Sequence, residues 1–417
     1  MRPFRASLAG LLWVSALLIG CGGASSDDAA TATSSTTSVA EATTTAPPTT
    51  ATTTTTTTTT TTPVTELAIN HVQVLGSHNS YHLKPDPAIF GALAALAPTL
   101  AESIEYSHRP LTEQLDTFGI RQFEIDVHAD PDGSLYAARA ADSLVGLTDT
   151  ADPVLSEAGF KVLHTPDVDY ATTCLTLVRC LAEIDEWSTA NPTHLPLMIM
   201  LEFKSESVPD VAADEGVELT VELPWTVPIE ATAELLDALD AEIRSVFDGD
   251  RLIEPDDVRG DAPTLESAVL ENGWPSLAES RGKVLFTMTD GGAIRDLYVD
   301  GTPSLEGRPI FTNGTPGNPD AAFVRFDDPA DAGLDAAVAA GYLVRTRTDS
   351  PTGDARANDS TRRDLALETG AHFLSTDYYA VSEFFESAYV VELPGGMVAR
   401  CNPISAPTTC TEDQLAE

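Results

Sequence analysis

Residues 122–128, with the sequence QFEIDVH, alternate apolar and acidic side chains. In a β-strand, successive side chains point to opposite faces, so Glu124 and Asp126 share one face and the three apolar residues share the other. Two carboxylates two residues apart on one strand face repel each other and favour a cation between them. The segment therefore predicts a strand that carries an acidic, cation-binding site.

Three other segments end an apolar run with a histidine, an asparagine or a glutamate. They are residues 76–81 (GSHNSY), 162–166 (VLHTP) and 198–204 (MIMLEFK). In a (β/α)8 barrel, the carboxyl ends of the strands carry the functional residues. We therefore expect these segments to meet the acidic strand at one end of a barrel.

Eight apolar segments, separated mostly by helical patterns, predict an α/β fold of the TIM-type (β/α)8 barrel class over residues 66–417. The expected strands are 66–76, 122–128, 160–163, 197–201, 283–288, 322–326, 342–346 and 372–375. Helical spacing predicts helices over 88–100, 111–118, 174–187 and 231–247. The acidic segment 206–228 has no clear period and is expected to be an irregular insertion.

The first 65 residues are not expected to belong to the barrel. Arg2 and Arg5 precede a short apolar run, so residues 1–20 have the pattern of an export signal. The sequence LIGC, which ends at Cys21, resembles a bacterial lipobox. This implies cleavage before Cys21 and a lipid on its sulfur, whereas the alternative is ordinary secretion with a free cysteine. Residues 21–65 are rich in Ser and Thr and predict a disordered linker. The expected location is extracytoplasmic, lipid-anchored to the cell membrane or secreted.

The chain has five cysteines and a formal net charge of −41. With Cys21 set apart, the remaining cysteines form two short-range candidate disulfides, Cys174–Cys180 and Cys401–Cys410, as expected in an oxidising compartment. Nucleic acid is not an expected partner, because binding a polyanion requires a basic surface. We expect a monomer.

Candidate metal ligands at the strand ends all offer oxygen atoms: Asn79, Glu124, Asp126 and Glu202. Oxygen ligands select Ca²⁺ or Mg²⁺, whereas zinc would require histidine or cysteine. A single acidic residue in so acidic a chain is ordinarily a solvated surface charge. Four oxygen ligands at strand ends favour an open Ca²⁺ site.

His78 and His164 follow two other predicted strands, and imidazole transfers protons near neutral pH. Beside a cation, two imidazoles suit phosphodiester chemistry. One accepts the proton of the attacking hydroxyl, the other protonates the leaving oxygen, and the cation offsets charge on the phosphate. The sequence leaves open which histidine is the base and which is the acid.

The ordered set His78-Asn79, Glu124-Ile125-Asp126, His164 and Glu202 resembles the motifs of the calcium-dependent phosphatidylinositol-specific phospholipases C. The likeness extends to the bacterial lipoprotein and secreted branch of that PLC-like phosphodiesterase superfamily, and residues 370–379 resemble its last strand. The resemblance implies that the four oxygen ligands hold Ca²⁺ and that both histidines are catalytic. It also implies a reaction in which an inositol 2-hydroxyl attacks phosphorus, releasing diacylglycerol and a cyclic inositol phosphate that water can then open.

A phosphoinositide or related phosphodiester lipid is the expected substrate, and the N-terminal lipid would hold the enzyme at the membrane. Lys204, Arg345 and Arg347 are candidate phosphate contacts, with ordinary salt bridges as the alternative. Tyr378 is a candidate for stacking on the inositol ring, with packing as the alternative.

Two other functions are alternatives to this prediction. A glycerophosphodiester phosphodiesterase shares the barrel and the Glu-x-Asp pattern, but that family begins its site with His-Arg, where this chain has His78-Asn79. A catalytically silent surface lipoprotein would bind a ligand at the old site. Retention of both histidines and all four oxygen ligands argues against that loss of activity.

Overall fold

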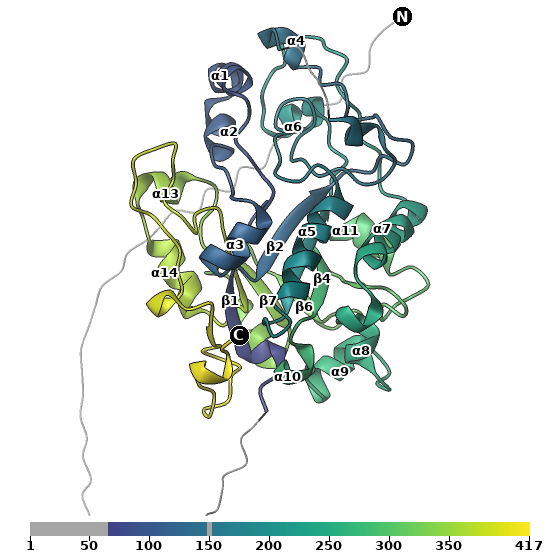
Figure 1. The fold of residues 1–417 in the computed structure, drawn as a ribbon, viewed down its shortest axis with the longest axis vertical. Helices are drawn as coiled ribbons and strands as arrows, with labels where there is room; N and C mark the ends of the chain where they lie inside the picture. The colour runs from purple at the N-terminus through teal and green to yellow at the C-terminus, as the bar shows by residue number, and fades with distance from the viewer. Residues whose placement is uncertain (1–65, 148–151) are drawn as a thin grey trace, which may run out of the picture. The chain divides into compact units, whose positions relative to one another are not determined.

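The computed structural model describes residues 66–147 and 152–417 of the chain (Figure 1). The predicted signal at 1–20, the linker at 21–65 and lipid attachment at Cys21 lie outside the described residues. The described part is built on eight parallel strands in the neighbour order β5-β4-β3-β2-β1-β8-β7-β6. These are β1 (Val72–Ser77), β2 (Gln122–Val127), β3 (Leu197–Phe203), β4 (Val284–Met288), β5 (Ile310–Phe311), β6 (Phe323–Arg325), β7 (Leu343–Arg347) and β8 (Phe373–Thr376).

A single parallel bridge between Asn313, just after β5, and Phe323 of β6 joins the two ends of this order. The strands therefore form a nearly closed barrel, which confirms the predicted TIM-type fold. A short strand, β9 (Ala399–Cys401), runs antiparallel to β1 with Cys401 opposite Val72. Gly76 lets β1 approach β2, because a Cβ atom there would lie 2.8 Å from the Cβ of Gln122.

The predicted strand at 160–163 is wrong. Lys161 makes only isolated antiparallel bridges, to His128 and Thr176, while β2 pairs directly with β3 over six residues. Val162 and Leu163 are buried in a loop, so their apolar character reflects packing rather than a place in the sheet. The two-residue strand β5 takes the eighth place, and a strand this short gives no periodicity to detect. The other seven predicted strands each overlap an observed strand.

The helix predicted at 111–118 is α3 (Leu111–Phe118), and the one at 88–100 is divided by Pro98 into α1 (Pro87–Leu96) and α2 (Pro98–Ser103). The other two predicted helices are α5 (Leu177–Ala190) and α7 (Ala233–Val246). The segment 206–228, predicted to be irregular, contains α6 (Val208–Asp214). The remaining helices are α4 (Asp142–Val145), α8 (Pro255–Arg259), α9 (Leu265–Glu271), α10 (Leu277–Ser280), α11 (Gly292–Tyr298), α12 (Leu334–Ala340), α13 (Gly353–Ala357) and α14 (Thr361–Glu368). Short 3₁₀ turns are η1 (Ile69–His71), η2 (Pro153–Ser156), η3 (Gly249–Arg251), η4 (Pro394–Gly396) and η5 (Glu412–Gln414).

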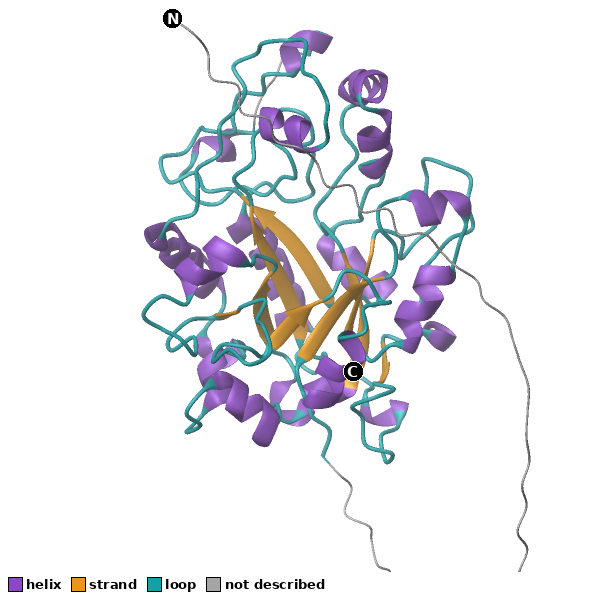
Figure 2. Cartoon of the chain, turned by 180° about the vertical axis from the view of Figure 1, so that it is seen from behind, coloured by secondary structure: helices purple, strands orange, loops and turns teal. Residues whose placement is uncertain are grey.

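Helices lie outside the strands in both views (Figures 1 and 2). Strands β2 and β4 are buried along their whole length, as barrel strands covered by helices should be. Helices α1, α2, α4 and α6 lie beyond the carboxyl end of β2, at the end of the barrel where the site is expected (Figure 1). Both predicted disulfides, Cys174–Cys180 and Cys401–Cys410, are present. Within the described ranges, no helix combines the length and apolar character that a membrane span requires.

Candidate active site

The end of β1 presents His78 and Asn79. The backbone N–H of His78 donates to the carbonyl of Thr376 at 3.0 Å, which ties this end of β1 to β8. Asn79 has φ 44°, a left-handed conformation that asparagine tolerates better than most residues. Its Nδ2 group donates to the hydroxyl of Tyr106 at 3.3 Å. Its Oδ1 atom is buried and has no hydrogen-bond partner among the described residues.

The three predicted acidic ligands lie on the neighbouring strands β2 and β3, with Asp126 directly opposite Glu202. Both carboxylate oxygens of Asp126 are buried and lack a hydrogen-bond partner in the described part of the chain. Burial raises the pKa of Asp126 well above its usual value, and Glu202 and Glu124 add to this rise against the opposing charge of Lys204. A buried carboxylate in this setting requires either a proton or a cation.

Two basic residues already contact these carboxylates. The Nζ atom of Lys204 lies 3.0 Å from Oε1 of Glu202 and 3.8 Å from Oδ2 of Asp126. The Nη2 atom of Arg345 lies 2.5 Å from Oε2 of Glu124, and its Nη1 atom binds Asp327 at 2.6 Å. Lys204 is partly exposed, whereas the Arg345 side chain is only 1% exposed. Of these two basic residues, Lys204 is therefore the one that solvent can reach.

For three candidate substrate residues the structure supports the alternative. Arg345 makes the salt bridges just described, and Arg347 pairs with Asp349 at 3.2 Å and with Asp377 at 2.8 Å. Tyr378 is buried, and its ring packs edge-on against those of Phe385 and Tyr389. These side chains therefore make the salt bridges and the packing that were the alternatives to substrate contact, and substrate contact at the three residues stays a prediction.

His78 is paired with a carboxylate that sequence reasoning missed. Its Nδ1 atom lies 2.9 Å from Oδ1 of Asp377, directly after β8, and Arg347 holds the other oxygen of Asp377. Since a carboxylate only accepts, Nδ1 carries the proton and Nε2 is left as an acceptor, 3.9 Å from Oε1 of Glu124. Burial and then the charge of Arg347 lower the pKa of His78 well below its usual value, although Glu124 opposes this. His78 is therefore neutral and ready to take a proton near pH 7. A carboxylate two residues after the last predicted strand, 372–375, was the available signal.

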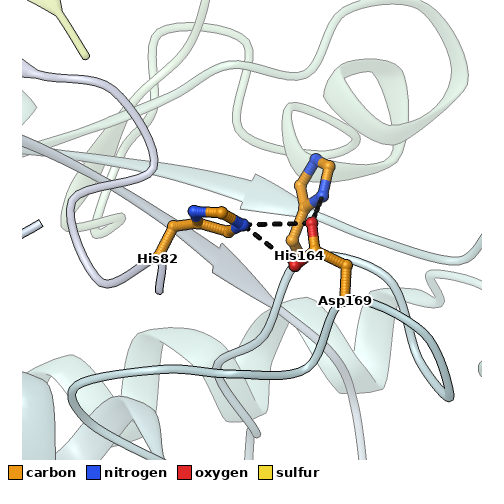
Figure 3. A group of neighbouring side chains, drawn as sticks. All are labelled: His82, His164 and Asp169. Carbon is orange, nitrogen blue, oxygen red and sulfur yellow. Dashed lines mark hydrogen bonds and ion pairs between the residues drawn. The ribbon is translucent and has the colours of Figure 1, made fainter. Parts of the chain in front are cut away.

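His164 reaches the site from a loop rather than from a strand end. Thr165 and Asp169 exchange backbone hydrogen bonds of 3.0 and 2.9 Å, and this turn brings Asp169 against His164. Oδ2 of Asp169 lies 2.8 Å from Nδ1 of His164, and its two oxygens lie 2.9 and 3.1 Å from Nε2 of His82 (Figure 3). Sequence reasoning missed both Asp169 and His82, because neither follows an apolar run.

An apolar cavity of about 90 Å³ adjoins His164. Its walls come from α1, α2, α6 and residues 217–219, and the loop residues His164, Thr165, Val168 and Asp169 also line it. Leu93, Leu100, Ile104 and Val211 are among the lining side chains. No other predicted site residue lines this cavity, so it lies on the His164 side of the site.

The chemistry of the predicted ligands suits a calcium ion. Glu124, Asp126 and Glu202 lie on β2 and β3, Asn79 follows β1 by two residues, and all four offer hard oxygen atoms. Three of those oxygens, one on Asn79 and two on Asp126, are buried without a hydrogen-bond partner among the described residues. Buried polar atoms left unpaired are costly, and coordination to a cation would satisfy them.

Comparison with known proteins gives a family. Residues 67–403 match the family described as phosphoinositide phospholipase C, Ca²⁺-dependent. A search of curated proteins returned no match. Among solved structures, a calcium-dependent phosphoinositol-specific phospholipase C from Pseudomonas sp. is 16% identical, with 82% of this chain and 97% of that chain covered and a TM-score of 0.46. The phosphatidylinositol-specific enzymes from Streptomyces antibioticus (18% identity, coverage 75% and 95%, TM-score 0.44) and Listeria monocytogenes (15%, 78% and 92%, 0.42) are also similar.

Proposed function

Because the chain belongs to the Ca²⁺-dependent phosphoinositide phospholipase C family, we propose that the cluster at the ends of β1, β2 and β3 is its catalytic centre. The protein is a Ca²⁺-dependent phosphodiesterase that acts on phosphatidylinositol-type lipids. The roles of individual residues follow from the geometry described above. The observation that carries them is the pairing of His78 with Asp377 and of His164 with Asp169.

In this proposal His78 is the general base. Its Nδ1–H donates to Asp377, so Nε2 accepts the proton of the inositol 2-hydroxyl as that oxygen bonds to phosphorus. The lowered pKa of His78, caused first by burial and then by Arg347, keeps the ring unprotonated before the reaction.

His164 is the general acid in this proposal. It borders the apolar cavity, which suits the glyceride side of a lipid and not the inositol side. The bond between phosphorus and the glycerol oxygen breaks, and Nε2 of His164 gives its proton to that oxygen. The products are diacylglycerol and a cyclic inositol phosphate.

Asn79, Glu124, Asp126 and Glu202 would hold the calcium ion, which when bound offsets negative charge on the phosphate. Lys204 adds a positive charge on the same side, 3.0 Å from Glu202.

The test is a panel of phosphodiesters assayed with calcium and with a chelator. We expect a water-soluble inositol phosphate to be released from phosphatidylinositol, and this release to be lost in the chelator. Preference for glycerophosphodiesters would favour the phosphodiesterase alternative. Calcium binding with no turnover of any substrate would favour the silent binding protein.

We also propose that Cys21 carries a lipid that holds the enzyme, as a monomer, on the outer side of the cell membrane. The support is the LIGC sequence and the export signal before it. Metabolic labelling with a radioactive fatty acid should mark the wild-type protein and not Cys21→Ser. Light scattering of the purified protein should give the mass of one chain.

A further inference from the structure

We propose that Asp169 and His82 position His164 for proton donation, so that the His82–Asp169–His164 trio forms an acid unit separate from the His78–Asp377 pair. This inference rests on the proposed function, in which His164 protonates the leaving oxygen. Figure 3 shows Asp169 between the two imidazoles, with interactions to both.

The carboxylate of Asp169 is buried and held by its two histidine partners. Its side chain is 2% exposed, and both of its oxygens face imidazole nitrogens at 2.8 to 3.1 Å. The turn from Thr165 to Asp169 fixes its backbone on the same loop as His164. A buried carboxylate held this way fixes the orientation of the ring that it binds and stabilises the protonated form of that ring.

His82 supports Asp169 from a fully enclosed position. The ring of His82 is buried, its centroid lies 4.3 Å from that of Tyr106, and its Nδ1 atom has no hydrogen-bond partner among the described residues. Because a carboxylate only accepts, Nε2–H of His82 donates to Asp169. The negative charge on Asp169 can stabilise a positive charge on His164.

His164 differs from His82 in exposure. Its side chain is 25% exposed and borders the apolar cavity, whereas that of His82 is fully enclosed. Because Nδ1 of His164 donates to Asp169, Nε2 is the nitrogen left to face a substrate. The trio thus has one ring that supports the carboxylate and one that can reach a leaving group.

The same three residues have ligand atoms within 4.8 Å of one another and so could hold a metal ion. Such an ion would be held by one atom of each residue, Asp169 included, and would replace the protons between them. The hydrogen bonds already present satisfy all four of the atoms involved, which favours the proton-handling arrangement. The experiment distinguishes the two.

The experiment compares two substrates that differ in leaving group. Phosphatidylinositol releases a strongly basic alkoxide that must be protonated, whereas a 4-nitrophenyl ester of inositol 1-phosphate releases a weakly basic phenolate. We expect Asp169→Asn to lower turnover of the lipid by about 10- to 10²-fold, which is within the rate contribution of general acid catalysis. Turnover of the aryl ester should fall by no more than about 3-fold. Asp377→Asn is the matched control, because it impairs the base and should slow both substrates.

The pH profile gives a second readout. A general acid must be protonated before it reacts, so the rate on the lipid falls at high pH. Asp169→Asn removes the adjacent negative charge and should move this alkaline limb to lower pH, with His82, His78 and Glu202 unchanged nearby. His82→Gln keeps a donor to Asp169 and should show the same pattern more weakly, and it serves as the test variant if Asp169→Asn does not fold.

If folded Asp169→Asn and His82→Gln lose turnover equally on the lipid and on the aryl ester, the role of these residues is purely structural. That result would overturn the inference. Loss of wild-type activity in a chelator that removes zinc but spares calcium would make the trio a metal site and would also overturn it. A wild-type enzyme that cleaves neither substrate would refute the proposed function itself. A wild-type enzyme that cleaves both, with variants impaired equally, would refute only the role of the trio.

Discussion

Replacing Asp169 by asparagine removes a buried negative charge while keeping the shape of the side chain. Burial alone would raise the pKa of Asp169, but the charges and hydrogen bonds of His82 and His164 outweigh it and lower this pKa from 3.8 to about 2. A carboxylate whose pKa is lower in the folded protein stabilises the fold above its unfolded pKa. That contribution is lost as pH falls through the folded pKa.

The lowered pKa of Asp169 determines how much its carboxylate stabilises the fold and over which pH range that contribution is lost. The lowered pKa corresponds to roughly 2 kcal/mol of folding free energy at pH 6. Less than half of this contribution remains at pH 2.5, close to the folded pKa. The wild type should therefore exceed Asp169→Asn in stability by about 2 kcal/mol at pH 6, and the gap should narrow by more than half at pH 2.5.

Urea unfolding at a series of pH values measures this gap without adding salt that would screen the charges. Asp132→Asn, at an exposed turn, is the control, and it should change stability by less than about 0.5 kcal/mol. A gap that stays constant from pH 6 to pH 2.5 would refute the reasoning, because a purely steric effect of the substitution does not depend on pH.

Four further predictions concern the site and the fold. Asp126→Asn removes a charged ligand, so calcium affinity by calorimetry and turnover should fall together, each by at least about 10-fold; retained calcium affinity would exclude Asp126 as a ligand. His164→Ala should keep calcium affinity while turnover falls by about 10²–10⁴-fold, and a loss of calcium binding would count against its assignment as the acid. Lys204→Met removes a cation that lies 3.0 Å from Glu202 and should raise calcium affinity while lowering turnover; unchanged values of both would place Lys204 outside the site. Replacing Cys401 and Cys410 by alanine opens a link between residues nine apart and should lower the free energy of unfolding by about 2–3 kcal/mol, whereas an unchanged urea midpoint would contradict this.

The barrel could be predicted from sequence where its strands are long and buried on both faces. Residues 197–201 form a continuous apolar run, and residues 122–128 alternate apolar and acidic side chains. Both patterns correctly predicted a strand with candidate site residues at its carboxyl end. The two-residue strand β5 gave no such signal, because its place depends on the neighbours that close the barrel. The apolar pair at 162–163 is buried by a loop, and burial alone does not distinguish a loop from a strand.

In the site, too, residues at strand ends could be predicted and residues in loops could not. Asn79, Glu124, Asp126 and Glu202 could be placed together because each lies at or near the end of a strand, and strand ends meet at one end of a barrel. Asp169 and His82 belong to loops, and their contact with His164 depends on a turn that only the folded chain shows. The prediction placed His164 at the end of a strand, whereas in the structure a loop brings it to the site.

The two cations beside the acidic cluster differ in a way that explains how one site can serve both calcium and phosphate. Arg345 is enclosed and divides its guanidinium between Glu124 and Asp327, so it is fixed and neutralises part of the acidic charge permanently. Lys204 is partly exposed on a flexible stem and lies 3.0 Å from Glu202 and 3.8 Å from Asp126. Once a calcium ion satisfied those two carboxylates, Lys204 would no longer be held by them, and its ammonium group could turn to a phosphate. We therefore propose that Arg345 stabilises the ligand set and that Lys204, the exposed cation, exchanges partners and takes part in the reaction.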